Sequence, residues 1–188
     1  TPDDPHLPKL PGAELGQLVD LSRVAMSAGR VASDRTGQPI GLYREHCVHC
    51  HGITGDGAGP TAAFLNPYPR DYRMGRFKFK STLKGQRPTH DDLKRIVLEG
   101  VAGTAMPSFK VLDLDEVESL VHYVKYLAIR GEVERRLSDE MVELDEGQRL
   151  VADASDKQRD AAAYQAKIAR LNEIVVEVVQ PWLEAETQ

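Results

Sequence analysis

The sequence has little of what several large protein classes require. It contains only two cysteines, Cys47 and Cys50, so no second cysteine pair is present to complete a zinc site. It has no run of about eighteen apolar residues, so we expect no membrane span in this chain. Its 29 acidic residues outnumber its 24 basic ones, and the net charge of -5 excludes a general nucleic-acid binder.

The two cysteines belong to one short motif, Cys47-Val48-His49-Cys50-His51. Two cysteines three positions apart, with a histidine directly after the second, are the attachment motif for a c-type haem. Each thiol can form a thioether to one vinyl group of the porphyrin, and His51 can bind the iron as the proximal ligand. We therefore expect one covalent haem c on Cys47 and Cys50.

A thioredoxin-like redox pair uses the same cysteine spacing. That arrangement needs a strand before the motif, whereas Pro39 to His46 is predicted to be helical. Tyr43 lies one helical turn before Cys47 and is predicted to pack towards the haem edge.

The residues after His51 include four glycines and then Pro60. Such a glycine-rich loop can turn closely around one side of a porphyrin. A backbone carbonyl near Pro60 is the candidate acceptor for the ring N–H of His51.

The segment 70–87 has seven basic residues against a single acid, Asp71. The two propionates of a haem need charge-assisted partners when they are buried, so the candidates are Arg70, Tyr72, Arg73 and Arg76. Solvated surface charges are the alternative. The alternation of Arg76 to Lys80 indicates a short strand.

A distal ligand is predicted in the loop 101–109, between a helix that begins after Thr89 and another that begins after Asp113. Met106, followed by Pro107, offers a soft, neutral thioether that favours ferrous iron. Core packing is the alternative role for a methionine. The other candidate ligands are Met74, Met26, Met141 and His90. His46, His49 and His122 are expected to be surface or structural residues.

These motifs resemble those of a class I cytochrome c domain over residues 39 to 130: a helix into Cys-x-x-Cys-His-Gly, a glycine-rich loop, a middle helix, a Met-Pro loop and an amphipathic closing helix. Pro39 and Gly41 depart from the small residues often found before the first cysteine. The resemblance implies an all-α fold with ligands His51 and Met106. It divides the chain into an N-terminal arm and helix (1–37, with the helix at 13–28), a haem domain (38–131) and a helical extension (132–188).

The extension carries an apolar seam at alternating three- and four-residue spacing over 161–182. Three arrangements would bury it: a helical hairpin folded on the haem domain, a dimer, or contact with a larger complex. We expect the extension to form either a helical hairpin or one long helix.

These features favour an electron carrier rather than an enzyme. The alternatives are a module or enzyme that binds gas or peroxide after Met106 is displaced, and a haem-bearing structural subunit of a larger redox complex. The expected partners are a redox donor and acceptor, acidic at the docking face because of the 70–87 cations. Because haem is attached on the outer side of the bacterial inner membrane, we expect a periplasmic or otherwise extracytoplasmic location in a respiratory chain. The start, Thr1 to Pro5, lacks the features of a signal peptide, so we expect that a signal or tether was removed.

Overall fold

The computed structural model describes residues 15–29, 41–142, 158 and 160–187, and within them every regular element is a helix. The all-α fold class is confirmed. The expected proline-rich arm and Pro39 lie outside the described residues. The elements are α1 (Leu15–Leu18), α2 (Leu21–Ala28), α3 (Leu42–His46), α4 (Val48–His51), the 3-10 helices η1 (Ala62–Phe64) and η2 (Tyr72–Met74), α5 (His90–Glu99), α6 (Leu114–Met141) and α8 (Ala161–Ala185).

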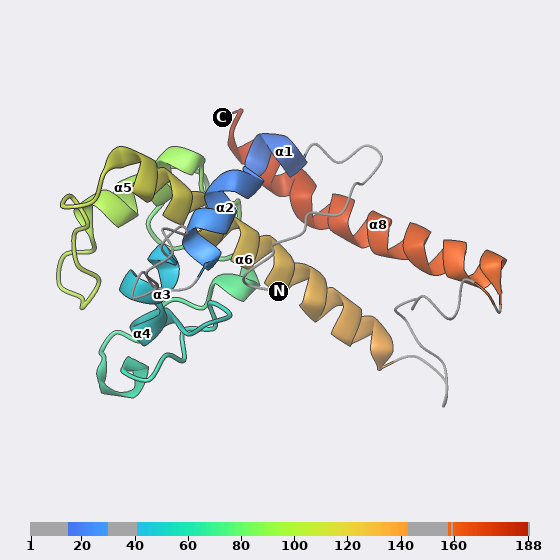
Figure 1. Ribbon diagram of the computed structural model, residues 1–188, viewed down its shortest axis with the longest axis horizontal. Coiled ribbons are helices and arrows are strands. Elements are labelled where there is room, and N and C mark those ends of the chain that lie inside the picture. The colour runs from blue at the N-terminus through green and yellow to red at the C-terminus, as the bar shows by residue number, and fades with distance from the viewer. Residues whose placement is uncertain (1–14, 30–40, 143–157, 159, 188) are drawn as a thin grey trace.

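Helix α6 runs through the middle of the molecule, and α2, α3 and α5 pack around its N-terminal half (Figure 1). The helix begins at a capping box in which the backbone N–H of Asp113 donates to Glu116 at 2.9 Å. One face of the helix is buried through Val117, Leu120, Val121, Val124, Leu127 and Ala128. The predicted cap and the predicted apolar face are both confirmed.

The predicted helix 13–28 is interrupted at Val19 and Asp20, which separate α1 from α2. Asp20 ends the first helix and caps the second, because its carboxylate accepts from the backbone N–H of Ser22 at 2.8 Å and of Arg23 at 3.4 Å.

The strand expected at Arg76–Lys80 is wrong: these residues form an irregular loop. Among the described residues no neighbouring strand pairs with them, and a single strand leaves its backbone groups unpaired. Gly75, with φ of 59°, turns the chain directly before this loop.

Helix α6 continues through the expected domain boundary after residue 131. Gly131 does not end the helix but lets it approach η2. A Cβ atom at Gly131 would lie 2.4 Å from the Cβ atom of Arg73. One helix therefore spans the end of the expected haem domain and the start of the expected extension.

Helix α8 folds back antiparallel along the second half of α6 (Figure 1). Ion pairs join Glu140 to Arg170 and Arg136 to Glu177, so residues further along α6 meet residues earlier along α8. The C-terminal half of the predicted seam is buried at Ile174, Val175, Val178, Val179 and Trp182. Its N-terminal half, through Tyr164 and Ile168, keeps partial exposure. The structure thus shows the helical hairpin among the three expected arrangements.

The C-terminal end of α8 is tied to the rest of the fold by Glu186. The ammonium of Lys125, only 2% exposed, donates to the Glu186 carboxylate at 2.6 Å. The same carboxylate accepts from the backbone N–H of His90 at 3.0 Å. None of the described helices combines the length and the hydropathy needed to cross a membrane.

Candidate functional site

Cys47, Cys50 and His51 line one cavity together. Helix α4 is a single turn, closed by backbone bonds from Cys50 N and His51 N to the Cys47 oxygen at 3.2 and 2.9 Å. This turn brings the two thiols and the imidazole to one wall. The two cysteines form no disulfide bond.

The imidazole of His51 is held by a backbone carbonyl. Its Nδ1 lies 3.1 Å from the oxygen of Arg70, so Nδ1 carries the proton and donates, and Nε2 keeps its lone pair. Burial lowers the pKa of His51 more than this hydrogen bond raises it. The ring is therefore neutral near pH 7, the state that a metal ligand requires.

The prediction that a carbonyl near Pro60 accepts from the ring N–H of His51 is wrong, because the carbonyl of Arg70 is the acceptor. Pro60 is exposed and does not line the cavity. The glycine loop turns onto α4 itself instead, because Gly57 N donates to His51 O at 2.9 Å and Gly59 N donates to Cys50 O at 3.1 Å. A Cβ atom at Gly59 would lie 2.3 Å from the oxygen of His49, so only glycine fits there.

Tyr43 is fully buried but lies outside the cavity lining, contrary to the predicted contact with the haem edge. Its hydroxyl donates to the oxygen of Gly52 at 2.9 Å, and its ring packs on Tyr123 at 4.9 Å. Burial raises its pKa well above the usual value, so the hydroxyl stays protonated. Tyr43 therefore stabilises the C-terminal end of α4 without lining the cavity.

Met106 lines the same cavity from the loop after α5. The loop is held by hydrogen bonds from Val101 N to Met106 O and from Met106 N to Thr104 Oγ1, both at 3.1 Å. At Gly100 a Cβ atom would lie 2.7 Å from Met106 O, so glycine permits this tight loop.

The other candidate ligands lie elsewhere. Met74 and Met141 are 39% and 59% exposed. Met26 Sδ lies 3.6 Å from Ser119 Oγ, and His90 pairs with Glu118. Among the described residues that line the cavity, Met106 is the one methionine.

Two of the four propionate candidates line the cavity, Arg70 and Tyr72. Tyr72 stacks on the His51 ring, with centroids 4.6 Å apart and an interplanar angle of 22°. Arg73 does not line it, because its guanidinium donates to Asp71 from both Nε and Nη2 at 3.0 Å. Arg76 is exposed and also lies outside the lining.

Several lining residues were not predicted from the sequence. Lys78 lies on the wall between Phe77 and Phe79, in the segment expected to be a strand. His46, expected to be a surface or structural residue, also lines the cavity. Its ring lies beside that of Phe109, with the ring centroids 5.8 Å apart. Most of the remaining wall is apolar: Leu65, Leu93, Ile96, Val97, Val101, Pro107, Val121 and Val124.

This set of residues fits a haem. It combines two thiols, the neutral imidazole of His51 and the thioether of Met106 with an apolar wall and the cations Arg70 and Lys78. Burial, and then the neighbouring Cys50, raise the pKa of Cys47 to about 12, so its thiol is protonated at neutral pH.

The helical fold and this site define a cytochrome c domain. Residues 34–124 match the family model described as "Cytochrome C oxidase, cbb3-type, subunit III", so this segment is similar to that family. Such a domain implies haem-based electron transfer. The match ends within α6, so α8 lies outside it.

One solved structure resembles part of the chain. It is a chain of the Kuenenia stuttgartiensis reducing HAO-like protein complex Kustc0457/Kustc0458, with 31% sequence identity and a TM-score of 0.45. The similarity covers 46% of this chain and 39% of that chain, so this protein spans about two fifths of the neighbour. Comparison with the curated proteins finds no match.

Proposed function

We propose that this protein is a monohaem c-type cytochrome that carries single electrons, with one haem bound covalently through Cys47 and Cys50. His51 and Met106 are the proposed axial ligands. The observation that carries the proposal is that these four side chains, from two distant segments, line one cavity. When bound, the haem supplies an iron that alternates between the ferrous and ferric states.

The chain's own residues prepare this cavity. The carbonyl of Arg70 holds the proton on Nδ1 of His51 and so directs Nε2 for ligation. The thioether of Met106 is soft and neutral, which favours the ferrous state. The apolar wall from α5 and α6 excludes water and so favours the less charged iron site.

Arg70 and Lys78 are the proposed partners of the propionates, since they are the cations of the cavity wall. The basic residues of the 70–87 segment that stay exposed, such as Arg76, are proposed to attract an acidic redox partner. That attraction predicts electron-transfer rates that fall as salt is added, whereas rates independent of salt would contradict it.

The proposed location is periplasmic or otherwise extracytoplasmic, because covalent haem attachment to this motif takes place there. In the cell the protein works in a respiratory chain, free or tethered. Fractionation of the producing cells tests this directly: haem-bearing protein belongs in the periplasmic or membrane fraction, and its appearance in the cytoplasm would contradict the proposal.

The attachment is tested by producing the protein in cells that attach c-type haem. Intact mass should show one added haem per chain, which remains after denaturation. The Cys47→Ser, Cys50→Ser double variant should lose it, while His49→Ala, a change at an exposed site in the same motif, should retain it. Absence of covalent haem from the unmodified protein would overturn the proposal.

The carrier role is tested by a redox titration with carbon monoxide as a probe. A six-coordinate site should titrate with a single one-electron step, and its reduced spectrum should not change on addition of carbon monoxide. A carbon monoxide complex formed at once would favour a gas-binding module instead.

A further inference from the structure

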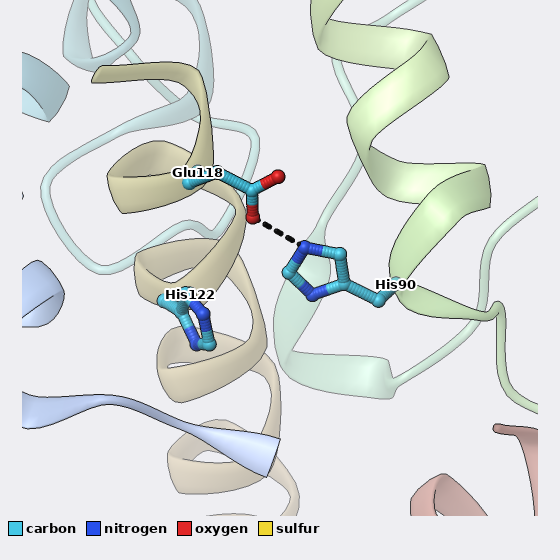
Figure 2. Close-up of side chains that lie close together, drawn as sticks. All are labelled: His90, Glu118 and His122. Atoms are coloured by element: carbon cyan, nitrogen blue, oxygen red, sulfur yellow. Dashed lines mark hydrogen bonds and ion pairs between the residues drawn. The ribbon is translucent and has the colours of Figure 1, made fainter. Parts of the chain in front are cut away.

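Outside the haem cavity, three potential metal ligands gather between two helices. His90, Glu118 and His122 each offer a ligand atom, and these atoms all lie within 4.8 Å of one another. Figure 2 shows His90 projecting from the start of α5 towards α6, which carries the other two residues. None of the three lines the haem cavity.

The fold fixes these positions independently of any ligand. Glu118 and His122 are four residues apart on α6 and therefore share one face of the helix. His90 is the first residue of α5, and its backbone N–H is bound by Glu186 at 3.0 Å. The two imidazole centroids lie 5.2 Å apart, at an angle of 56°.

We propose that His90, Glu118 and His122 bind a divalent transition-metal ion, with zinc the ion that best matches the ligands. Two imidazoles and one carboxylate, with a fourth position open to water, are a ligand set that zinc uses in proteins. All three residues are partly buried, which limits competition from water while leaving a route for the ion.

The existing hydrogen bonds show what the ion would replace. His90 Nε2 and Glu118 Oε2 lie 2.6 Å apart and share a proton, and the ion takes the place of that proton. The other carboxylate oxygen, Oε1, is bound by the ammonium of Lys94 at 2.5 Å. Lys94 can keep this contact and hold the carboxylate in place while Oε2 binds the ion.

His122 requires one further exchange. Its Nδ1 accepts from the backbone N–H of Asp20 at 3.1 Å, so in the metal-free protein its proton is on Nε2. Binding through Nε2 moves that proton to Nδ1, and binding through Nδ1 displaces the N–H directly. In either case the hydrogen bond from the backbone N–H of Asp20 is lost. The amide of Asp20, the residue that caps α2, therefore changes its environment when the ion binds.

The test is calorimetric titration with zinc chloride. The protein is used with haem attached, or without haem after both thiols are alkylated, so that Cys47 and Cys50 bind no zinc and the result does not depend on the proposed function. One zinc per chain is expected. Single variants His90→Asn, Glu118→Gln and His122→Asn should each weaken binding at least about 10-fold.

The matched control is His49→Asn, which removes an exposed histidine outside the cluster and should bind zinc like the unmodified protein. Calcium should not bind, because it prefers oxygen ligands. Absence of zinc binding, or equal affinity in all four variants, would overturn the proposal. Circular dichroism of each variant checks that it is folded, and Glu118→Gln keeps an acceptor for His90.

A second measurement tests the geometry. The amide resonance of Asp20 should shift on zinc addition in the unmodified protein, because its hydrogen bond to His122 is lost. An unchanged Asp20 amide in the zinc-bound protein would overturn the assignment of His122 as a ligand.

Discussion

Replacing Trp182 with alanine should destabilise the whole fold, because this side chain joins α8 to the cavity wall. Trp182 is completely buried. Its ring packs edge to face on the ring of Phe77, a residue of the cavity lining, with the ring centroids 6.0 Å apart. Its indole N–H donates to the carboxylate of Glu132 on α6 at 3.3 Å.

The expected loss is about 4 kcal/mol of unfolding free energy. Truncation of a buried Trp to Ala costs about 3–5 kcal/mol through lost burial and the cavity left behind. The lost hydrogen bond contributes to this cost only modestly, because Glu132 keeps its ion pair with Arg87. For a chain of this size, each kcal/mol corresponds to about 2–4 °C, so the melting temperature should fall by about 8–16 °C.

Urea and thermal unfolding followed by far-ultraviolet circular dichroism measure this loss. The control is Gln180→Ala, an exposed change two residues earlier on α8, which should shift the free energy by less than about 0.5 kcal/mol. If Trp182→Ala were as mild as the control, α8 would not be packed against the cytochrome domain as the structure shows.

Three smaller changes test other contacts by the same unfolding measurements. Gly131→Ala should cost about 1–3 kcal/mol, because the new Cβ would lie 2.6 Å from the Cα atom of Arg73; a gain from the better helix propensity of Ala would contradict this contact. Asp92→Asn should cost about 2 kcal/mol at pH 7, since the buried carboxylate accepts from Ser81 N at 2.8 Å. Burial opposes ionisation, but the hydrogen bonds outweigh it and lower the pKa of Asp92 below 3.8. The carboxylate's contribution should therefore be complete above about pH 4 and disappear as the pH falls through the lowered pKa, and an effect of Asp92→Asn that is constant down to pH 2 would contradict this. Tyr43→Phe should cost about 1–2 kcal/mol, because it leaves the carbonyl at the end of α4 without its donor, and a neutral effect would show that water replaces the hydroxyl.

The parts of the site that the sequence predicted are those with a side-chain signature. The Cys47–His51 motif, the capped helices before and after the Met106 loop, and the apolar face of α6 each follow from residue types at fixed spacing. Their spacing along the chain is short, so local geometry is sufficient to place them.

The missed features depend on the backbone or on distant packing. The acceptor for His51 is the carbonyl of Arg70, and a carbonyl is present at every residue and gives no signal in the sequence. A domain boundary was expected after residue 131, but α6 continues through it, and Gly131 packs against Arg73, 58 positions earlier in the chain. The burial of Tyr43 was predictable, whereas the side of α3 on which it packs depends on Tyr123 of α6.

The central claim is that Met106 completes a closed haem site, and the absorption spectrum of the oxidised haem protein tests it most directly. The unmodified protein should show a sulfur-to-iron charge-transfer band, which Met106→Ala abolishes. Met74→Ala, at a partly exposed methionine outside the cavity, should keep the band. Absence of the band from the unmodified protein, or its persistence in Met106→Ala, would contradict methionine ligation by this residue.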